Sequence, residues 1–427
     1  MLALAYLLLI GFVIKMELIE KTIKILEKLL CNHCLGRFYS GLLSGYTNEE
    51  RGKFLRALIA MMIDSKAIDY SKINSSNFYG FKFRINKEFS PTKPENCFLC
   101  NNLFEDLEEY AKKAIKKLKD IEFNNFLVGS IIPPEILEKE EKLWEITGID
   151  YVESIKSEIN RELGKKIWNI VKKPVNFKNP NIVILLNLEK KDIEIKINSL
   201  FVLGYYKKFV RNIPQCKWGT PGKYKTSIQE IIAKPIMRVT NGKNNSMHGY
   251  GREDVNARCL DWRPFVIEIT EPKIRNFNFR KIESQINKGK KIKIKLLKIA
   301  DKFTVRRIKS EMGDKTYRLV VKFNNPVEKN ELKKLKSLVG LIHQRTPIRV
   351  SHRRADLIRK RLVKSLRYRQ INKKTIELTI KTNAGLYVKE LVTGDDGRTK
   401  PSVAEVLGIE TKPKNLDVIK IERPKNL

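Results

Sequence analysis

Apolar residues recur at helical spacing in three segments near the start of the chain. Residues 17–30 keep their leucines and isoleucines on one side of a helix. A Thr-x-x-Glu capping box at residues 47–50 predicts a second helix, with Phe54 and Leu58 turned inward. A third amphipathic helix is expected to begin at Leu103. The first hundred or so residues are therefore predicted to be mainly helical.

Alternating and fully apolar runs then predict strands mixed with helices. Strands are expected near residues 126–132, 182–186, 193–197, 265–269, 290–296, 315–323 and 376–381. Helices are expected near residues 153–171, 328–341 and 403–407. The very basic segment 349–369 fits either a strand or a helix that carries a phosphate-binding face. The fold class predicted is mixed α/β, of the α+β type.

The large positive charge of the chain indicates what class of molecule it binds. The 427 residues carry a net charge of +37, and Lys and Arg occur in nearly every segment. With 42% hydrophobic residues the chain has enough apolar material for two or three packed domains. A polyanion is the expected partner of such a surface, and a membrane surface is the weaker alternative.

Four of the six cysteines form two C-x-x-C pairs, Cys31 with Cys34 and Cys97 with Cys100. Two such pairs suit a tetrahedral structural zinc ion, although 62 residues separate them. The alternative is four reduced, unpaired thiols. His33 is expected to be a bystander rather than a ligand. This cysteine usage is typical of a reducing cytoplasm.

Residues 1–15 are strongly apolar but too few for a comfortable membrane span. They also lack the basic start and cleavage site of a signal peptide. We interpret them as an upstream extension or a mis-assigned start, with a weak membrane anchor as the other interpretation.

The segment 250–258 places Asp254 between Arg252 and Arg258, just before an expected strand. A turn with a solvated ion pair is one interpretation. The other is a carboxylate whose charged form is favoured by nearby arginines and which is held ready for chemistry. Glu253 and Asp261 are the alternative carboxylates.

Four motifs follow one another over about 190 residues. They are Gly251-Arg-Glu-Asp254-Val-x-x-Arg258, Lys315-x-Tyr317-Arg318, His352-Arg-Arg-Ala-Asp356 and Gly385-Leu-Tyr387-Val-Lys389-Glu-Leu391. Together they resemble tRNA pseudouridine synthases, and among these the archaeal and eukaryotic Pus-ten type that acts on T-loop uridines (tRNA positions 54 and 55). The paired cysteines fit this resemblance, since that family carries a zinc-binding region and a THUMP-like domain ahead of its catalytic core.

The resemblance implies a role for individual residues. Asp254 would be the essential aspartate of uridine isomerisation, and Lys389 the base that pairs with it. Tyr317 would stack on the target uracil, Tyr387 would be a second nucleotide contact, and Arg258 would assist in substrate binding. Whether Asp254 acts as nucleophile or as base stays open. The plainer alternatives are a core position for Tyr317, a surface position for Lys389 and phosphate contacts for Arg252 and Arg258.

The resemblance also implies the architecture and the partners. Residues 16–200 would form a zinc-stapled, THUMP-like accessory RNA-binding domain, and residues 201–427 a catalytic domain with a central antiparallel sheet. Arg349, Arg353 and Arg354 are the expected RNA-binding residues. Catalysis would need no cofactor, and the protein would be a cytoplasmic monomer that grips the T-loop and acceptor stem of tRNA. A non-catalytic RNA-binding protein is the alternative; a methyltransferase would need a methyl-donor loop that we do not find.

Overall fold

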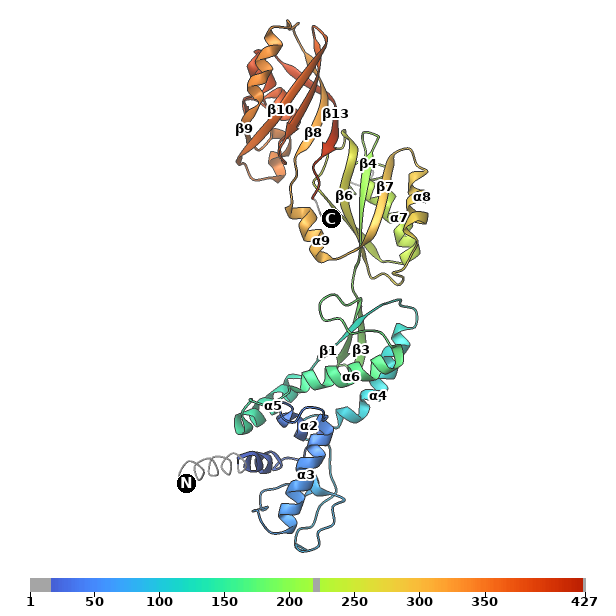
Figure 1. Cartoon of the computed structure of the whole chain (residues 1–427), viewed down its shortest axis with the longest axis vertical. Coiled ribbons are helices and arrows are strands. Elements are labelled where there is room, and N and C mark those ends of the chain that lie inside the picture. Colours follow the sequence, from blue (N-terminus) through green and yellow to red (C-terminus); the bar gives the residue numbers. More distant parts are fainter. Residues whose placement is uncertain (1–16, 218–222, 425–427) are drawn as a thin grey trace, which may run out of the picture. The chain divides into compact units, whose positions relative to one another are not determined.

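The structure is a computed structural model that describes residues 17–217 and 223–424 (Figure 1). The expectation for residues 1–15 lies outside this part of the chain. The chain divides into two compact units, Met1–Ile197 and Asn198–Leu427. Each unit has its own hydrophobic core and is described by itself.

The first unit contains the four predicted helices, of which the first ends at residue 25 instead of 30, and also two that were not predicted, at residues 32–36 and 134–147. They are a helix at residues 17–25, α2 (Asn32–Gly36), α3 (Asn48–Asp64), α4 (Leu103–Leu118), α5 (Pro134–Thr147) and α6 (Ile155–Val171), with short 3-10 turns η1 (Arg37–Tyr39) and η2 (Ser75–Phe78). Thr47 caps α3, and its hydroxyl accepts from the backbone N–H of Glu50 at 3.2 Å. The predicted capping box is thus confirmed.

The buried face of α3 differs from the one predicted. Phe54 and Leu58 are 53% and 41% exposed, while Ile59 and Ile63 are buried. The cause is close packing of α2 against α3, where a Cβ atom on Gly52 would lie only 2.0 Å from the carbonyl oxygen of Asn32. Backbone contact of this kind rotates the glycine face inward, which apolar periodicity alone does not reveal.

A small sheet completes the first unit. Strands β1 (Phe126–Ile131) and β2 (Ile182–Asn187) pair in parallel, and β3 (Asp192–Ile197) adds antiparallel to β2. Helix α6 packs on β1 through buried residues such as Ile159 and Leu163. Strands and helix lie where the hydrophobic pattern predicted them.

The second unit is built on one ten-stranded, mostly antiparallel sheet. Its strands are β4 (Leu200–Lys208), β5 (Asn244–Gly249), β6 (Arg258–Thr270), β7 (Ile292–Ala300), β8 (Lys315–Phe323), β9 (Gly340–Arg345), β10 (Ile358–Asn372), β11 (Thr375–Thr382), β12 (Thr399–Lys400) and β13 (Thr411–Ile421). The order is β12-β9-β10-β11-β8-β13-β6-β4-β7, with β5 paired to β6. Strand β13 lies between β8 and β6 and joins the two halves of the sheet.

Helices cover parts of this sheet (Figure 1). They are α7 (Ile228–Thr240), α8 (Phe279–Asn287), α9 (Lys302–Ser310), α10 (Val388–Thr393) and α11 (Val403–Leu407). The helix expected at 328–341 is instead a 3-10 segment, η3 (Glu331–Leu338), which still buries three leucines. The basic segment near 349 begins as a 3-10 turn, η4 (Ile348–Arg353), and continues as β10. Within the described residues, no helix has both the length and the apolar character needed to span a membrane.

Candidate active site and metal centre

The loop that joins β5 to β6, residues 250–257, has one fully buried acid. The Glu253 side chain accepts from the Tyr206 hydroxyl at 2.9 Å and pairs with Arg263 at 3.1 Å. The ammonium group of Lys208 lies 3.8 Å away. All of these side chains are essentially inaccessible to water. Glu253 therefore anchors the loop to the protein interior.

Buried donors also hold the backbone of this loop. Lys208 Nζ donates to the carbonyl oxygens of Asp254 and Val255 at 3.4 and 3.2 Å. Arg263 donates to the Tyr250 carbonyl at 2.8 Å, and Gln215 to that of Gly251 at 3.0 Å. Because charge-assisted bonds to buried carbonyls are strong and directional, they fix where the next side chain points.

Asp254 leaves this anchored loop on the opposite side. Its carboxylate lies 2.9 Å from Lys389 Nζ and 3.6 Å from Arg349 Nη1, and the side chain is 31% exposed. Burial acts to raise the pKa of Asp254, but Arg349 and Lys389 outweigh it and hold that pKa below its ordinary value. The carboxylate is therefore ionised at neutral pH while still open to a ligand.

Arg258 does not share this carboxylate. Its guanidinium makes two hydrogen bonds to Asp417, at 2.9 and 2.6 Å, and Arg211 binds the same acid. The expected pair of flanking arginines is thus replaced by Lys389 and Arg349, with Arg252 contributing only a lesser attraction. Asp417 lies on β13, so the partner of Arg258 comes from 159 residues away.

A single buried amide positions the turn that carries Lys389. Gln344, 1% exposed, donates to the Tyr387 carbonyl at 3.0 Å and accepts from the Tyr387 N–H at 2.8 Å. Tyr387 precedes α10, and Lys389 is the second residue of that helix. Lys389 Nζ also donates to the Asn256 side chain at 2.9 Å, so this ammonium bridges the loop and the helix.

The predicted aromatic residues line one cavity together with Asp254. This cavity has a volume of about 860 Å³ and is lined by Asp254, Tyr317, Arg349, Arg354, Tyr387 and Lys389, among others. Burial raises the pKa of Tyr317 to about 12, so its phenol stays neutral. The Tyr387 hydroxyl accepts from Arg354 at 2.6 Å. The volume and the mixed aromatic and charged lining suit a nucleotide.

The predicted RNA-binding arginines take different positions. Arg349 bonds to the buried Glu390 and lies beside Asp254, closer to the carboxylate than its place in a basic run implied. Arg354 touches Tyr387, and the side chain of Arg353 lies outside the described residues. Sequence reasoning missed the roles of Gln344 and Lys208, which lie outside the motifs, and of Glu390, which lies within the fourth motif but was given no role; all three are buried.

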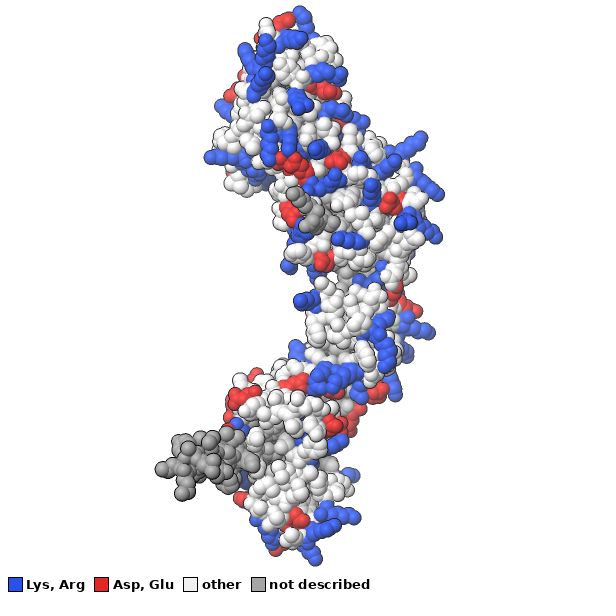
Figure 2. Space-filling model, in the orientation of Figure 1, with Lys and Arg blue, Asp and Glu red and all other residues white. Residues whose placement is uncertain are grey.

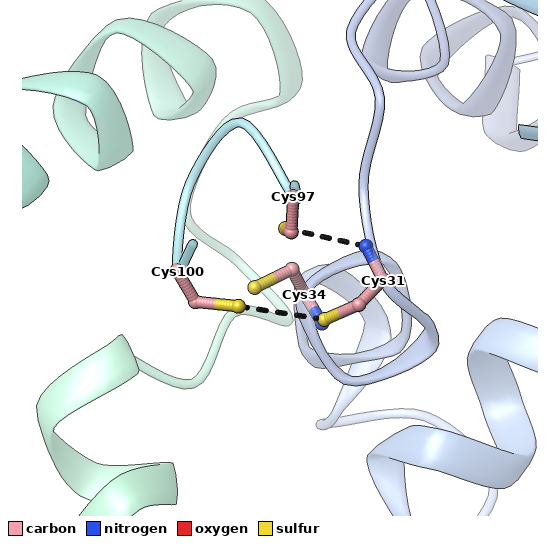
Figure 3. Close-up of side chains that lie close together, drawn as sticks. All are labelled: Cys31, Cys34, Cys97 and Cys100. Carbon is pink, nitrogen blue, oxygen red and sulfur yellow. Dashed lines mark hydrogen bonds between the residues drawn. The ribbon is translucent and has the colours of Figure 1, made fainter. Parts of the chain in front are cut away.

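The four paired cysteines of the first unit gather at one point (Figure 3). The sulfur atoms of Cys31, Cys34, Cys97 and Cys100 all lie within 4.8 Å of one another. Tetrahedral zinc–thiolate bonds of about 2.3 Å place sulfurs about 3.8 Å apart, and the Cys31 and Cys100 sulfurs lie 3.6 Å apart. The quartet could therefore hold a metal ion. His33 is outside it and stacks on Phe104.

Comparisons with known proteins cover nearly the whole chain. The family model described as "Pus10, C-terminal" matches residues 201–422, and the one described as "Pus10 THUMP domain, archaeal" matches residues 110–187. The proteins named tRNA pseudouridine synthase Pus10 of Methanothrix thermoacetophila and Pyrococcus furiosus are 36% and 38% identical to it. Each alignment covers 95% of this chain, and 94% and 98% of the respective relative. The chain belongs to the Pus10 family of tRNA pseudouridine synthases.

Proposed function

We propose that the second unit converts uridine to pseudouridine in tRNA, with Asp254 as the essential carboxylate. One observation carries this assignment. The ionised Asp254 lines a nucleotide-sized cavity, 2.9 Å from Lys389, and Tyr317 and Tyr387 line the same cavity. A turn that merely carries a solvated ion pair would need neither the cavity nor the aromatic residues.

The reaction breaks the N1–C1′ glycosidic bond of uridine and forms a C5–C1′ bond to the same ribose. Asp254 acts at the sugar, as a nucleophile at C1′ or as a base. Tyr317 provides a neutral aromatic face for the uracil, which must leave the RNA stack; such a contact is worth about 1–3 kcal/mol per base. Arg349 and Lys389 keep the carboxylate charged before the sugar arrives.

We propose T-loop uridines as the target and the first unit as an accessory tRNA-binding domain that contacts the acceptor stem. The THUMP match within that unit supports RNA binding. Lys and Arg side chains are spread over the visible face of both units (Figure 2), as a phosphate backbone requires. We expect a cytoplasmic monomer.

We also propose that the cysteine quartet holds structural zinc. Four thiolates leave no open position for substrate, so the metal would stabilise the first unit and take no part in the chemistry. Metal analysis of protein purified without chelator should give about one zinc per chain. Cys97→Ser should lose this zinc and lower the melting temperature, whereas Cys216→Ser, outside the quartet, should retain it. Metal-free wild-type protein would refute the assignment.

The functional proposal is tested with an unmodified tRNA transcript. Wild-type protein should form pseudouridine in the T-loop without added cofactor. Asp254→Ala should form none yet bind tRNA normally, and Asp120→Ala, which changes an exposed acid of the first unit, should retain full activity. A wild-type protein that binds tRNA but leaves uridine unchanged would instead be a non-catalytic RNA-binding protein.

A further inference from the structure

We propose that Lys315 is a further catalytic residue, whose ammonium group binds the carbonyl oxygens of the target uracil and stabilises the negative charge of the detached base. The inference rests on the proposed isomerase function and deepens it. It assigns a function to a further cation of the cavity, separate from the cations that hold Asp254.

The position of Lys315 supports contact with the base. Lys315 begins β8 and lies two residues before Tyr317, so both side chains point to the same face of the strand. Both line the cavity that contains Asp254, and Lys315 is only 8% exposed. Its Nζ would lie 3.1 Å from a Cβ atom on Gly251, a residue with φ +72°. A glycine at that point leaves the ammonium room beside the catalytic loop.

Lys315 also lacks a protein partner. Among the described residues its ammonium makes no hydrogen bond or ion pair; the one specific contact of this group is the Tyr250 ring, whose centroid is 5.7 Å away. Four other cations around the loop are engaged: Arg263 with Glu253, Lys208 with backbone carbonyls, and Lys389 and Arg349 with Asp254. Lys315 is mostly buried, but its ammonium is open to the cavity, where it is available to hydrogen-bond a ligand oxygen.

The surroundings of Lys315 keep its charge sensitive to pH. Burial and repulsion from Arg263 lower the pKa of Lys315 to about 8, against weaker attraction from Cys259, Asp314 and Glu253. The amine is thus largely protonated at neutral pH and loses its proton in mild alkali.

The chemistry requires stabilisation of an anion. When the N1–C1′ bond breaks, its electron pair stays on the uracil, whether Asp254 then bonds to C1′ or takes the C2′ proton. The resulting negative charge is shared by the two carbonyl oxygens. The base turns and C5 attacks C1′, as the Asp254–C1′ bond breaks or as Asp254 returns the C2′ proton. The C5 proton is then lost while N1 gains one. Lys315 keeps its proton throughout, and its three N–H donors can follow either oxygen as the base turns.

The test compares single-turnover rates and tRNA affinity of Lys315→Met, Lys315→Arg and a matched control, Lys322→Met, an exposed lysine of the same strand. The Met variant should react about 100-fold more slowly at saturating tRNA, the loss typical of one removed anion-stabilising donor. Its affinity for tRNA should be unchanged. The wild-type rate should fall as pH rises through about 8. The Arg variant should recover part of the rate without that alkaline decline, because its guanidinium stays charged.

The outcomes separate this inference from the proposed function. Inactive wild-type protein would overturn both. If the wild-type protein is active, two results would overturn the role of Lys315 alone. One is a Met variant that reacts at the full rate. The other is an alkaline decline of the rate that is unchanged in both variants. Melting temperatures check folding, and if the Met variant does not fold, the Arg variant and the wild-type pH profile still decide.

Discussion

The loop at residues 250–257 has two sides, and its two neighbouring acids are held in opposite ways. Glu253 is fully buried among Arg263, Lys208 and Tyr206 and has no access to a ligand. Asp254 is paired almost as closely, yet keeps 31% of its side chain exposed in a cavity. Both carboxylates touch basic groups, so charge pairing alone does not identify a reactive acid. We therefore expect the acid that faces the cavity, Asp254, to be the reactive one.

The largest difference is expected from removing the accessible acid. Asp254→Asn preserves shape but removes the charge, so pseudouridine formation should fall by about 10⁴-fold or more, as when other enzymes lose an essential acid or nucleophile. The melting temperature should barely change, because the site is partly solvated. Rates on a tRNA transcript and thermal unfolding measure the two effects. An active Asn variant would show that Asp254, like Glu253, is not the reactive acid.

Next comes loss of the buried acid. Glu253→Gln leaves Arg263 and Lys208 without their counter-charge, and breaking a buried pair in this way typically costs about 3–5 kcal/mol. Denaturant unfolding of the variant should show this loss, while protein that remains folded at low temperature should keep measurable activity. A stable variant with no activity would mean that Glu253, too, takes part in the chemistry.

A smaller effect should follow from freeing the loop backbone. Lys208→Met removes donors to the Asp254 and Val255 carbonyls. A displacement of about 1 Å at a reacting group can cost about 100-fold in rate. We therefore expect kcat to fall more than tRNA affinity, measured against Lys207→Met, a partly exposed lysine of the same strand, as control. Equal losses in both variants would argue against positioning by Lys208.

The smallest expected effect is a shift in pH dependence. Arg349 and Lys389 lower the pKa of Asp254, so its ion pairs contribute stability above the ordinary carboxylate pKa, which is lost as pH falls through the lowered value. Lys389→Met should raise this pKa and move the acid limb of the rate profile to higher pH. Exposed Lys412→Met should leave the limb in place. An unmoved limb in the Lys389 variant would show that Lys389 does not set the charge state.

Much of this organisation could be predicted from sequence. Hydrophobic periodicity located most helices and strands, and the motif order indicated the family before any contact was known. The family resemblance carried by the motifs also named Asp254, Tyr317, Tyr387 and Lys389, which the structure brings to one cavity. Sequence patterns were enough to predict those features that depend only on residues close together in the chain.

The rest depends on contacts between distant segments. Three contacts join separate strands or turns. Arg258 pairs with Asp417, and Arg349 lies beside Asp254. Gln344 hydrogen-bonds to the backbone of Tyr387. The exposed face of α3 was mispredicted for a similar reason, because glycine contacts with α2 outweighed apolar periodicity. No single-sequence pattern encodes a partner 159 residues away.

Strand β13 has a consequence for synthesis of the protein. Asp254 belongs to one half of the large sheet and Tyr317 to the other, and β13 is inserted between β6 and β8 to join them. As the chain leaves the ribosome, both halves emerge before residues 411–421 do, and domains form in this N-to-C order. A nascent chain halted before β13 would carry all the catalytic residues on an unfinished sheet. We therefore expect activity to appear only when translation has passed this strand.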